Sequence, residues 1–222
     1  MGSKVRSGAY IIETFTASET WTTPPGVTKV DYCVVGGGGG AGGYVSGISA
    51  AGGGGGGEVL QGTDLAVSGN LTVTIGEGGG TDWSGNPAEA GGDTTFGSIT
   101  ARGGNGGYQP GHGGASGDGH AGGAYNASST TGGGGGGDND NGSDATGDGG
   151  QGGDGTQCTI NSTYYGGGGL GGGGSPPYAA ISLGGDQAGG GGEYNDGVAI
   201  HGYDGIVIIK YRAPSKLFTF HG

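Results

Sequence analysis

Alternating apolar and polar positions open the chain. Residues 10–16 place Tyr10, Ile12 and Thr14 on one parity, and residues 27–35 are rich in β-branched side chains. Both patterns are typical of strands that are buried on one face. Between them, the prolines and glycine at positions 24–26 predict a turn.

Further strand patterns follow at 58–60, 70–75 and 94–101, and the most apolar run of the chain closes it at 205–211. No segment has the period of an α-helix. Because the ends of a compact domain often lie close together, the last strand is expected to pair with the first ones. The sequence therefore predicts an all-β fold without α-helix, in which strands at 10–35, 58–75, 94–101 and 205–211 form a β-sandwich or small barrel.

Composition changes this picture, because 69 of the 222 residues are glycine and only 30% are hydrophobic. Burying glycine returns little apolar area and costs much backbone entropy, so a side-chain core is insufficient. Collagen is excluded, since it needs glycine at every third position and abundant proline. A disordered tract and packed polyglycine II helices, with three residues per turn, are the remaining choices. The flanking strands favour the helices, and we expect a polyglycine II bundle at about 103–192.

The spacing in one tract supports this prediction. Gly149, Gly152 and Gly155 recur at every third position, Gly150 and Gly153 keep the same step, and Gln151 and Asp154 occupy the third face. A peripheral helix of a bundle needs this arrangement, with glycine on two faces and polar side chains outside. Residues 10–212 are expected to form one glycine-rich domain, with an N-terminal docking segment at 1–9 and a C-terminal tail at 213–222.

The chain is acidic, with a formal net charge of −12. Nucleic acid is not an expected partner, because phosphate contacts need clustered cations. No apolar stretch predicts a membrane span or a secretory signal peptide, so we expect synthesis in the cytoplasm without membrane insertion. Cys33 and Cys158 are candidates for a disulfide, although Cys33 lies in an apolar strand-like run and is expected as a small buried residue.

Returns between glycine tracts carry the candidate binding residues. An aromatic ring with a polar tip supplies contact area at low entropic cost, which suits recognition of sugars or protein loops. The alternative for each residue is that it caps the end of the bundle. The candidates for receptor binding at loop tips are Tyr108, His112, Tyr125, Tyr164, Tyr165, Tyr178 and Tyr194.

Asp138, Asp140 and Asp144 are weak candidates for a calcium site, since hard oxygen ligands suit that ion. Gly142 and Gly149 stand where an EF-hand loop would need ligands, so a solvated acidic turn is the competing interpretation. No catalytic motif or phosphate-binding Gly-Lys-Ser/Thr is present. We therefore expect a non-enzymatic protein, with no cofactor other than this candidate calcium.

Several motifs occur in the order of a known family. They are Trp21-Thr-Thr-Pro-Pro-Gly26, Cys33-Val-Val35 leading into Gly36, Val73-Thr-Ile-Gly-Glu-Gly-Gly79, Gly91-Gly-Asp-Thr-Thr-Phe-Gly97 and Asp204-Gly-Ile-Val-Ile-Ile-Lys-Tyr211. The chain resembles, over about 12–212, a glycine-rich domain common in tail proteins of tailed phages and prophages. It is also similar to distal tail-fibre adhesins with a polyglycine II sandwich.

The resemblance implies a virion tail-fibre or tail-tip protein that acts as an adhesin for the host cell surface. Its partners would be a host receptor or glycan, other tail proteins, and copies of itself in a homo-oligomer, and its location would be the virion tail. Those adhesins have a long N-terminal attachment domain, whereas this chain offers only 1–9 and 213–222 for docking. The alternative function is a structural tail component, such as a collar, stalk or decoration subunit, whose loops contact neighbouring subunits.

Overall fold

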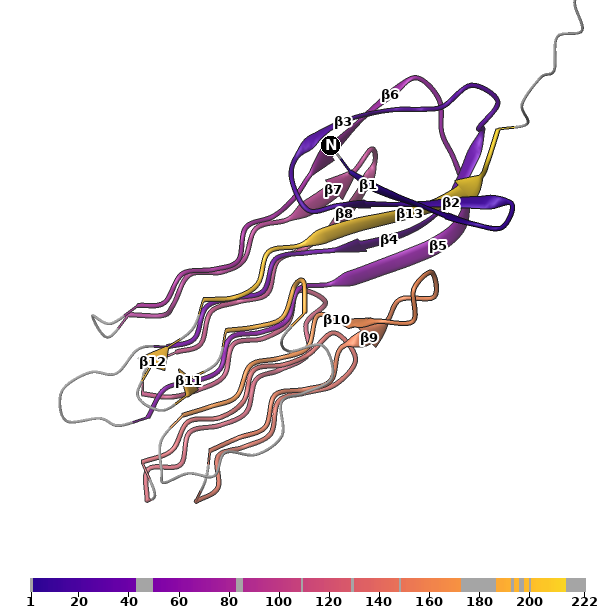
Figure 1. Ribbon diagram of the computed structural model, residues 1–222. Coiled ribbons are helices and arrows are strands. Elements are labelled where there is room, and N and C mark those ends of the chain that lie inside the picture. Colours follow the sequence, from indigo (N-terminus) through magenta and orange to yellow (C-terminus); the bar gives the residue numbers. More distant parts are fainter. Residues whose placement is uncertain are drawn as a thin grey trace, which may run out of the picture.

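A computed structural model describes residues 2–42, 50–82, 86–108, 110–128, 130–147, 149–172, 187–192, 194–195, 198–199 and 201–214. Figure 1 shows two regions: strands gather at one end, and undulating extended segments run side by side from them to the other end. The secondary structure assigned in the described residues is β, with no α-helix, as predicted.

Two antiparallel sheets form the strand region, which is a β-sandwich. The first has the order β1-β2-β13-β4-β5 and the second the order β3-β6-β7-β8, so the closing strand β13 pairs with β2 and β4 as expected. The bounds in the first sheet are β1 Ser3–Ser7, β2 Tyr10–Phe15, β4 Lys29–Val35, β5 Val59–Ala66 and β13 Ile206–Arg212. Those in the second are β3 Glu19–Thr22, β6 Asn70–Thr74, β7 Thr94–Phe96 and β8 Ile99–Ala101.

Aromatic and branched side chains fill the space between the two sheets. The Trp21 ring lies 5.8 Å from Phe96 and 5.9 Å from Tyr211, measured between centroids. Glu13 is only 1% exposed in this core, and its carboxylate accepts hydrogen bonds from Trp21 Nε1 at 3.1 Å and Tyr211 Oη at 3.0 Å. Lys4 Nζ from β1 lies 3.0 Å from the other Glu13 oxygen. This buried acid is thus fully partnered, as burial of a charge requires.

A second apolar cluster covers the outer face of the first sheet. It joins Cys33, Val35, Val59, Ile206 and Ile208 to a hairpin that returns from the glycine region and supplies Cys158, Ile160 and Tyr165. The hairpin contains β9 (Thr156–Gln157) and β10 (Tyr164–Tyr165), which pair antiparallel. A further two-residue pair, β11 (Tyr194–Asn195) and β12 (Val198–Ala199), lies at the opposite end of the molecule in Figure 1.

The extended segments form what we call the glycine array. Its members are 36–42, 50–57, 76–82, 86–93, 102–108, 112–118, 120–126, 131–138, 141–147, 149–155, 166–172, 187–192 and 201–205. The array is wider than the predicted bundle at about 103–192, since it also takes in the segments that leave β4 and β6 and the segment that enters β13. In the 149–155 segment, Gly150 and Gly153 are buried and Gln151 and Asp154 are partly exposed, as the spacing predicted, but Gly149 and Gly152 on the second glycine face are partly exposed too.

Hydrogen bonds in the array repeat every third residue, which is the signature of polyglycine II packing. In segment 50–57, the amides of residues 53 and 56 donate to segment 131–138, those of 54 and 57 to segment 187–192, and that of 55 to segment 102–108. Its carbonyls accept from segments 36–42, 112–118 and 166–172. Segment 50–57 is therefore bonded to six neighbours, and the amides of residues 53–57 and the carbonyls of residues 51–56 are satisfied without any sheet.

Candidate functional site

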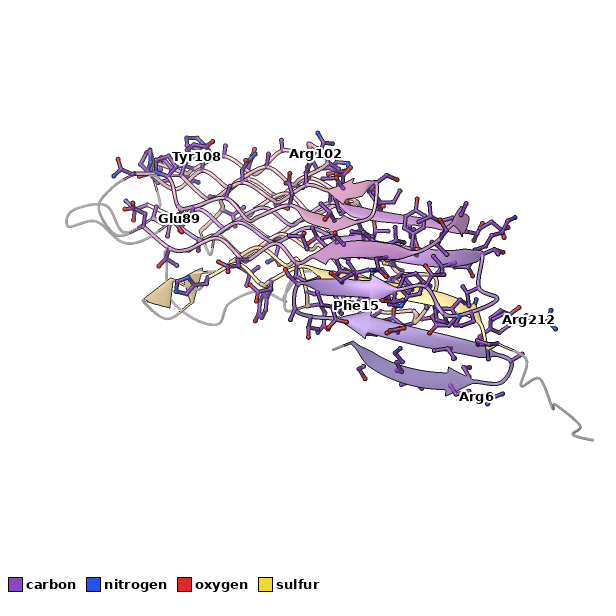
Figure 2. All side chains as sticks on the ribbon, turned by 90° about the horizontal axis from the view of Figure 1, so that it is seen from above. Arg6, Phe15, Glu89, Arg102, Tyr108 and Arg212 are labelled. Atoms are coloured by element: carbon purple, nitrogen blue, oxygen red, sulfur yellow. The ribbon has the colours of Figure 1, made fainter. Side chains whose placement is uncertain are left out.

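Loops at the far end of the array, which we call the distal end, form the candidate site. From 102–108 to 149–155, successive segments run away from and toward the sandwich in turn, so the turns that follow segments 102–108, 120–126 and 141–147 all lie at this end. Figure 2 shows Tyr108 at the end opposite Arg6 and Arg212. The fold thereby brings together loops that are far apart in the sequence and holds them on a bonded backbone scaffold.

A tight turn presents Tyr108. The Gly111 amide donates to the Tyr108 carbonyl at 2.8 Å, and the Tyr108 amide donates to the His112 carbonyl at 2.7 Å. Gly111 has a φ of +115°, a left-handed conformation that disfavours other residues. The Tyr108 side chain remains 44% exposed. The turn thus holds an aromatic ring in solvent on a fixed backbone.

His112 and Tyr125 lie beside this turn. Their ring centroids are 6.3 Å apart with an interplanar angle of 68°, an edge-on contact. The Tyr125 amide donates to His112 Nδ1 at 3.4 Å, which leaves Nε2 to carry the hydrogen of the neutral imidazole. The pair offers a hydrogen-bond donor next to an aromatic surface, a combination that suits a hydroxylated ligand.

Polar cross-links fix the remaining distal turns to one another. Asn126 Nδ2 donates to the Ala145 carbonyl at 3.3 Å, and Thr131 Oγ1 donates to the Thr146 carbonyl. The Asn126 carbonyl also accepts from the Thr131 amide, which closes the turn. Sequence reasoning did not select these residues, because a polar residue beside a glycine tract is the usual composition of any loop.

The structure divides the predicted receptor-binding residues between the two ends. Tyr108, His112 and Tyr125 lie together at the distal end, and the backbone of Tyr194 lies there too, in β11. Tyr164 and Tyr165 lie in the hairpin against the sandwich, where Tyr165 is 6% exposed and burial raises its pKa. Tyr178 is outside the described residues.

The candidate calcium ligands do not converge. Asp138 is buried beside the sandwich, where its carboxylate accepts from the Val59 amide at 2.7 Å and burial raises its pKa. The Asp144 carboxylate accepts from the Ala124 amide at 2.7 Å, whereas Asp140 bonds to the next amide in its own turn. No group of three or more metal-ligating side chains occurs among the residues that the structure describes.

Acidic and amide side chains have another role along the array. A peripheral segment has no neighbour on its outer side, so the amides that point outward need a different acceptor. Side-chain oxygens supply it at Gly78, Gly80, Arg102, Gly103, Ala121 and Ala124, from Asp204, Glu89, Glu58, Asp93, Asn141 and Asp144 respectively. The acidic composition is thus partly structural, because these carboxylates complete the backbone hydrogen bonding.

Within the described part of the chain, no helix has the length and apolarity to cross a bilayer. No curated protein matches the sequence significantly. A family model, described as a glycine-rich domain, matches residues 13–212. This range begins in β2 and ends with β13, so it contains nearly all of the sandwich and the whole array. The chain therefore belongs to the glycine-rich domain family.

Proposed function

We propose that the protein is a non-enzymatic tail-fibre or tail-tip component of a bacteriophage, made in the host cytoplasm and carried in the virion tail. It attaches to the host cell surface through the distal loops. The observation that carries this proposal is the placement of Tyr108, His112 and Tyr125 together at the end of the array remote from the sandwich.

The scaffold supports this function. A binding surface gains affinity when its loops are held in place before the ligand arrives, because less entropy is lost on binding. The distal turns are closed by backbone hydrogen bonds and continue into buried segments. Exposed tyrosine can stack on a sugar ring or pack against a receptor loop, while the imidazole of His112 can bond to hydroxyl groups.

The sandwich end would then serve for attachment to other tail proteins or to copies of the chain. β1 lies at the edge of its sheet with all five residues exposed, including Val5 at 61%. The outer edge of such a strand offers unpaired amides and carbonyls to a further strand. Residues 1–9, expected as a docking segment, contain this edge.

Binding of the purified protein to a panel of bacterial strains tests the proposal. We expect saturable binding to intact cells of a susceptible strain, lost when surface polysaccharide and outer-membrane proteins are stripped. Tyr108→Ala should weaken this binding at least tenfold, whereas Tyr10→Ala should not change it. Tyr10 is the matched control, since its side chain is 45% exposed and that of Tyr108 is 44% exposed, at opposite ends of the molecule.

Two results would contradict the proposal. One is equal binding by the Tyr108→Ala and Tyr10→Ala variants, which would mean that the distal loops do not contact the receptor. The other is absence of binding to every strain, together with a position along the tail shaft in electron micrographs of particles. The second result would support the structural alternative, in which the same loops contact neighbouring subunits.

A further inference from the structure

Two buried cysteines meet where the hairpin covers the sandwich. Cys33 lies on the outer face of β4 and Cys158 in the loop between β9 and β10, and both are 0% exposed. They belong to the same apolar cluster, and their thiols are hydrogen-bonded to each other. Both are free thiols in this structure.

The backbone on both sides of Cys158 is clamped beside Cys33. Gln61 on β5 is the register partner of Cys33 on β4. Its side-chain amide donates to the Gln157 carbonyl at 3.1 Å, and its carbonyl oxygen accepts from the Thr159 amide at 2.9 Å. The Gln61 side chain, next to Cys33, therefore hydrogen-bonds to the residues immediately before and after Cys158.

The two thiols have different proton affinities. The pKa of Cys158 is lowered to about 7, chiefly by the hydrogen bond that the Cys33 thiol donates to it. The backbone amides of Ile160 and Asn161 also lower this pKa, and burial opposes the change. The same thiol–thiol hydrogen bond, together with burial, raises the pKa of Cys33 well above its usual range. At neutral pH, Cys158 is thus partly thiolate, the nucleophilic form, next to a protonated thiol.

We propose that Cys33 and Cys158 form a reversible disulfide that fastens the hairpin to the first sheet. Hydrogen peroxide is the oxidant, and its small size suits a site enclosed by the hairpin. The Cys158 thiolate attacks one peroxide oxygen and breaks the O–O bond, which gives a sulfenic acid and hydroxide. The Cys33 sulfur then attacks the Cys158 sulfur, the Cys33 proton leaves with the sulfenic oxygen as water, and the S–S bond forms.

Oxidation of the folded protein tests the inference. After treatment with hydrogen peroxide, the intact mass should fall by two hydrogens, titratable thiols should disappear, and a digest should contain one peptide pair that joins Cys33 to Cys158. Because the bridge would close a loop of more than a hundred residues, the melting temperature should rise by roughly 5–15 °C and return to its starting value with dithiothreitol.

The Cys33→Ser variant is the control, since it keeps Cys158 without its partner thiol. It should gain oxygen at Cys158 under peroxide and show no rise in melting temperature. If this variant does not fold, the comparison of the oxidised and reduced parent still tests whether the disulfide forms and stabilises the protein. A parent that forms only intermolecular dimers, that gains oxygen without a cross-link, or that melts no higher when oxidised would overturn the proposal.

Discussion

Gly54 lies in segment 50–57, which is bonded to six neighbouring segments, and its replacement by alanine tests the packing directly. A Cβ atom at this position would lie 2.8 Å from the Gly40 carbonyl oxygen and closer still to that of Gly39. Contacts between carbon and oxygen normally begin at about 3.3 Å. The neighbouring segment would have to move away, because both partners of the clash are backbone.

The cost follows from what this movement strains. Overpacking a core costs about 1–3 kcal/mol. The displaced segment also carries the bonds from the Gly39 amide to the Gly55 carbonyl and from the Gly192 amide to the Gly39 carbonyl. Weakening each costs about 0.5–1.5 kcal/mol, while the lower entropy of unfolded alanine returns about 0.4–1 kcal/mol. We expect a net loss of about 1–6 kcal/mol, centred near 3 kcal/mol, out of a total stability of about 5–15 kcal/mol.

Thermal unfolding measures this loss. At about 2–4 °C per kcal/mol for a chain of this size, Gly54→Ala should lower the melting temperature by roughly 6–12 °C. Gly147→Ala is the matched control, since its new Cβ would meet no atom within 4 Å. It should melt within about 2 °C of the parent. If the two variants melted alike, the array would not be closely packed, and the reasoning would be wrong.

Two buried carboxylates give further predictions. Asp138→Ala should lower the free energy of unfolding by about 1–3 kcal/mol, because the Val59 amide loses its acceptor, whereas Asp138→Asn keeps that acceptor without the buried charge and should be at least as stable as the parent at pH 7. Since burial raises the pKa of Asp138, the folded state holds this proton more tightly than the unfolded chain does. The contribution of protonated Asp138 to the free energy of unfolding is therefore full below about pH 4 and declines as pH rises through the folded pKa. Urea denaturation at a series of pH values should show this decline in the parent and not in Asp138→Asn. Glu13→Ala should cost about 3–5 kcal/mol in the same assay, because Trp21 and Tyr211 lose their buried acceptor, and a loss below 1 kcal/mol would contradict that role.

The strand pattern was sufficient to predict most of the sandwich. β4 and β13 are recognisable because their alternation and β-branched content reflect burial in a sheet. β1 was instead interpreted as a docking segment, since its five exposed residues carry no apolar alternation. The pairs β9–β10 and β11–β12 span two residues per strand, which is too short for any period to show.

The arrangement of the array could not be predicted in the same way. Glycine has no side chain, so nothing in a tract such as 50–57 indicates which neighbours surround it. Tyr164 was grouped with the loop tips because a return near the sandwich has the same composition as a distal one. Counting the segments, which alternate in direction as far as 166–172, is the signal that places Tyr164 at the sandwich end. The contact between Cys33 and Cys158 depends on the hairpin folding back over the sheet, which the spacing of two cysteines does not reveal.

The three-residue repeat of the array has a consequence for folding. A polyglycine II helix advanced by one residue and rotated by a third of a turn coincides with itself. Residues 52–57 are all glycine, so this run can slide by one position and recover the same hydrogen bonds. The position of this run along its helix axis must therefore be fixed by residues outside the run. Strand β5, which begins just after the run, fixes it. The sandwich is then the template for the array, assembly is expected to spread from the sheets toward the tips, and a single glycine added to this run should be absorbed as a longer distal loop.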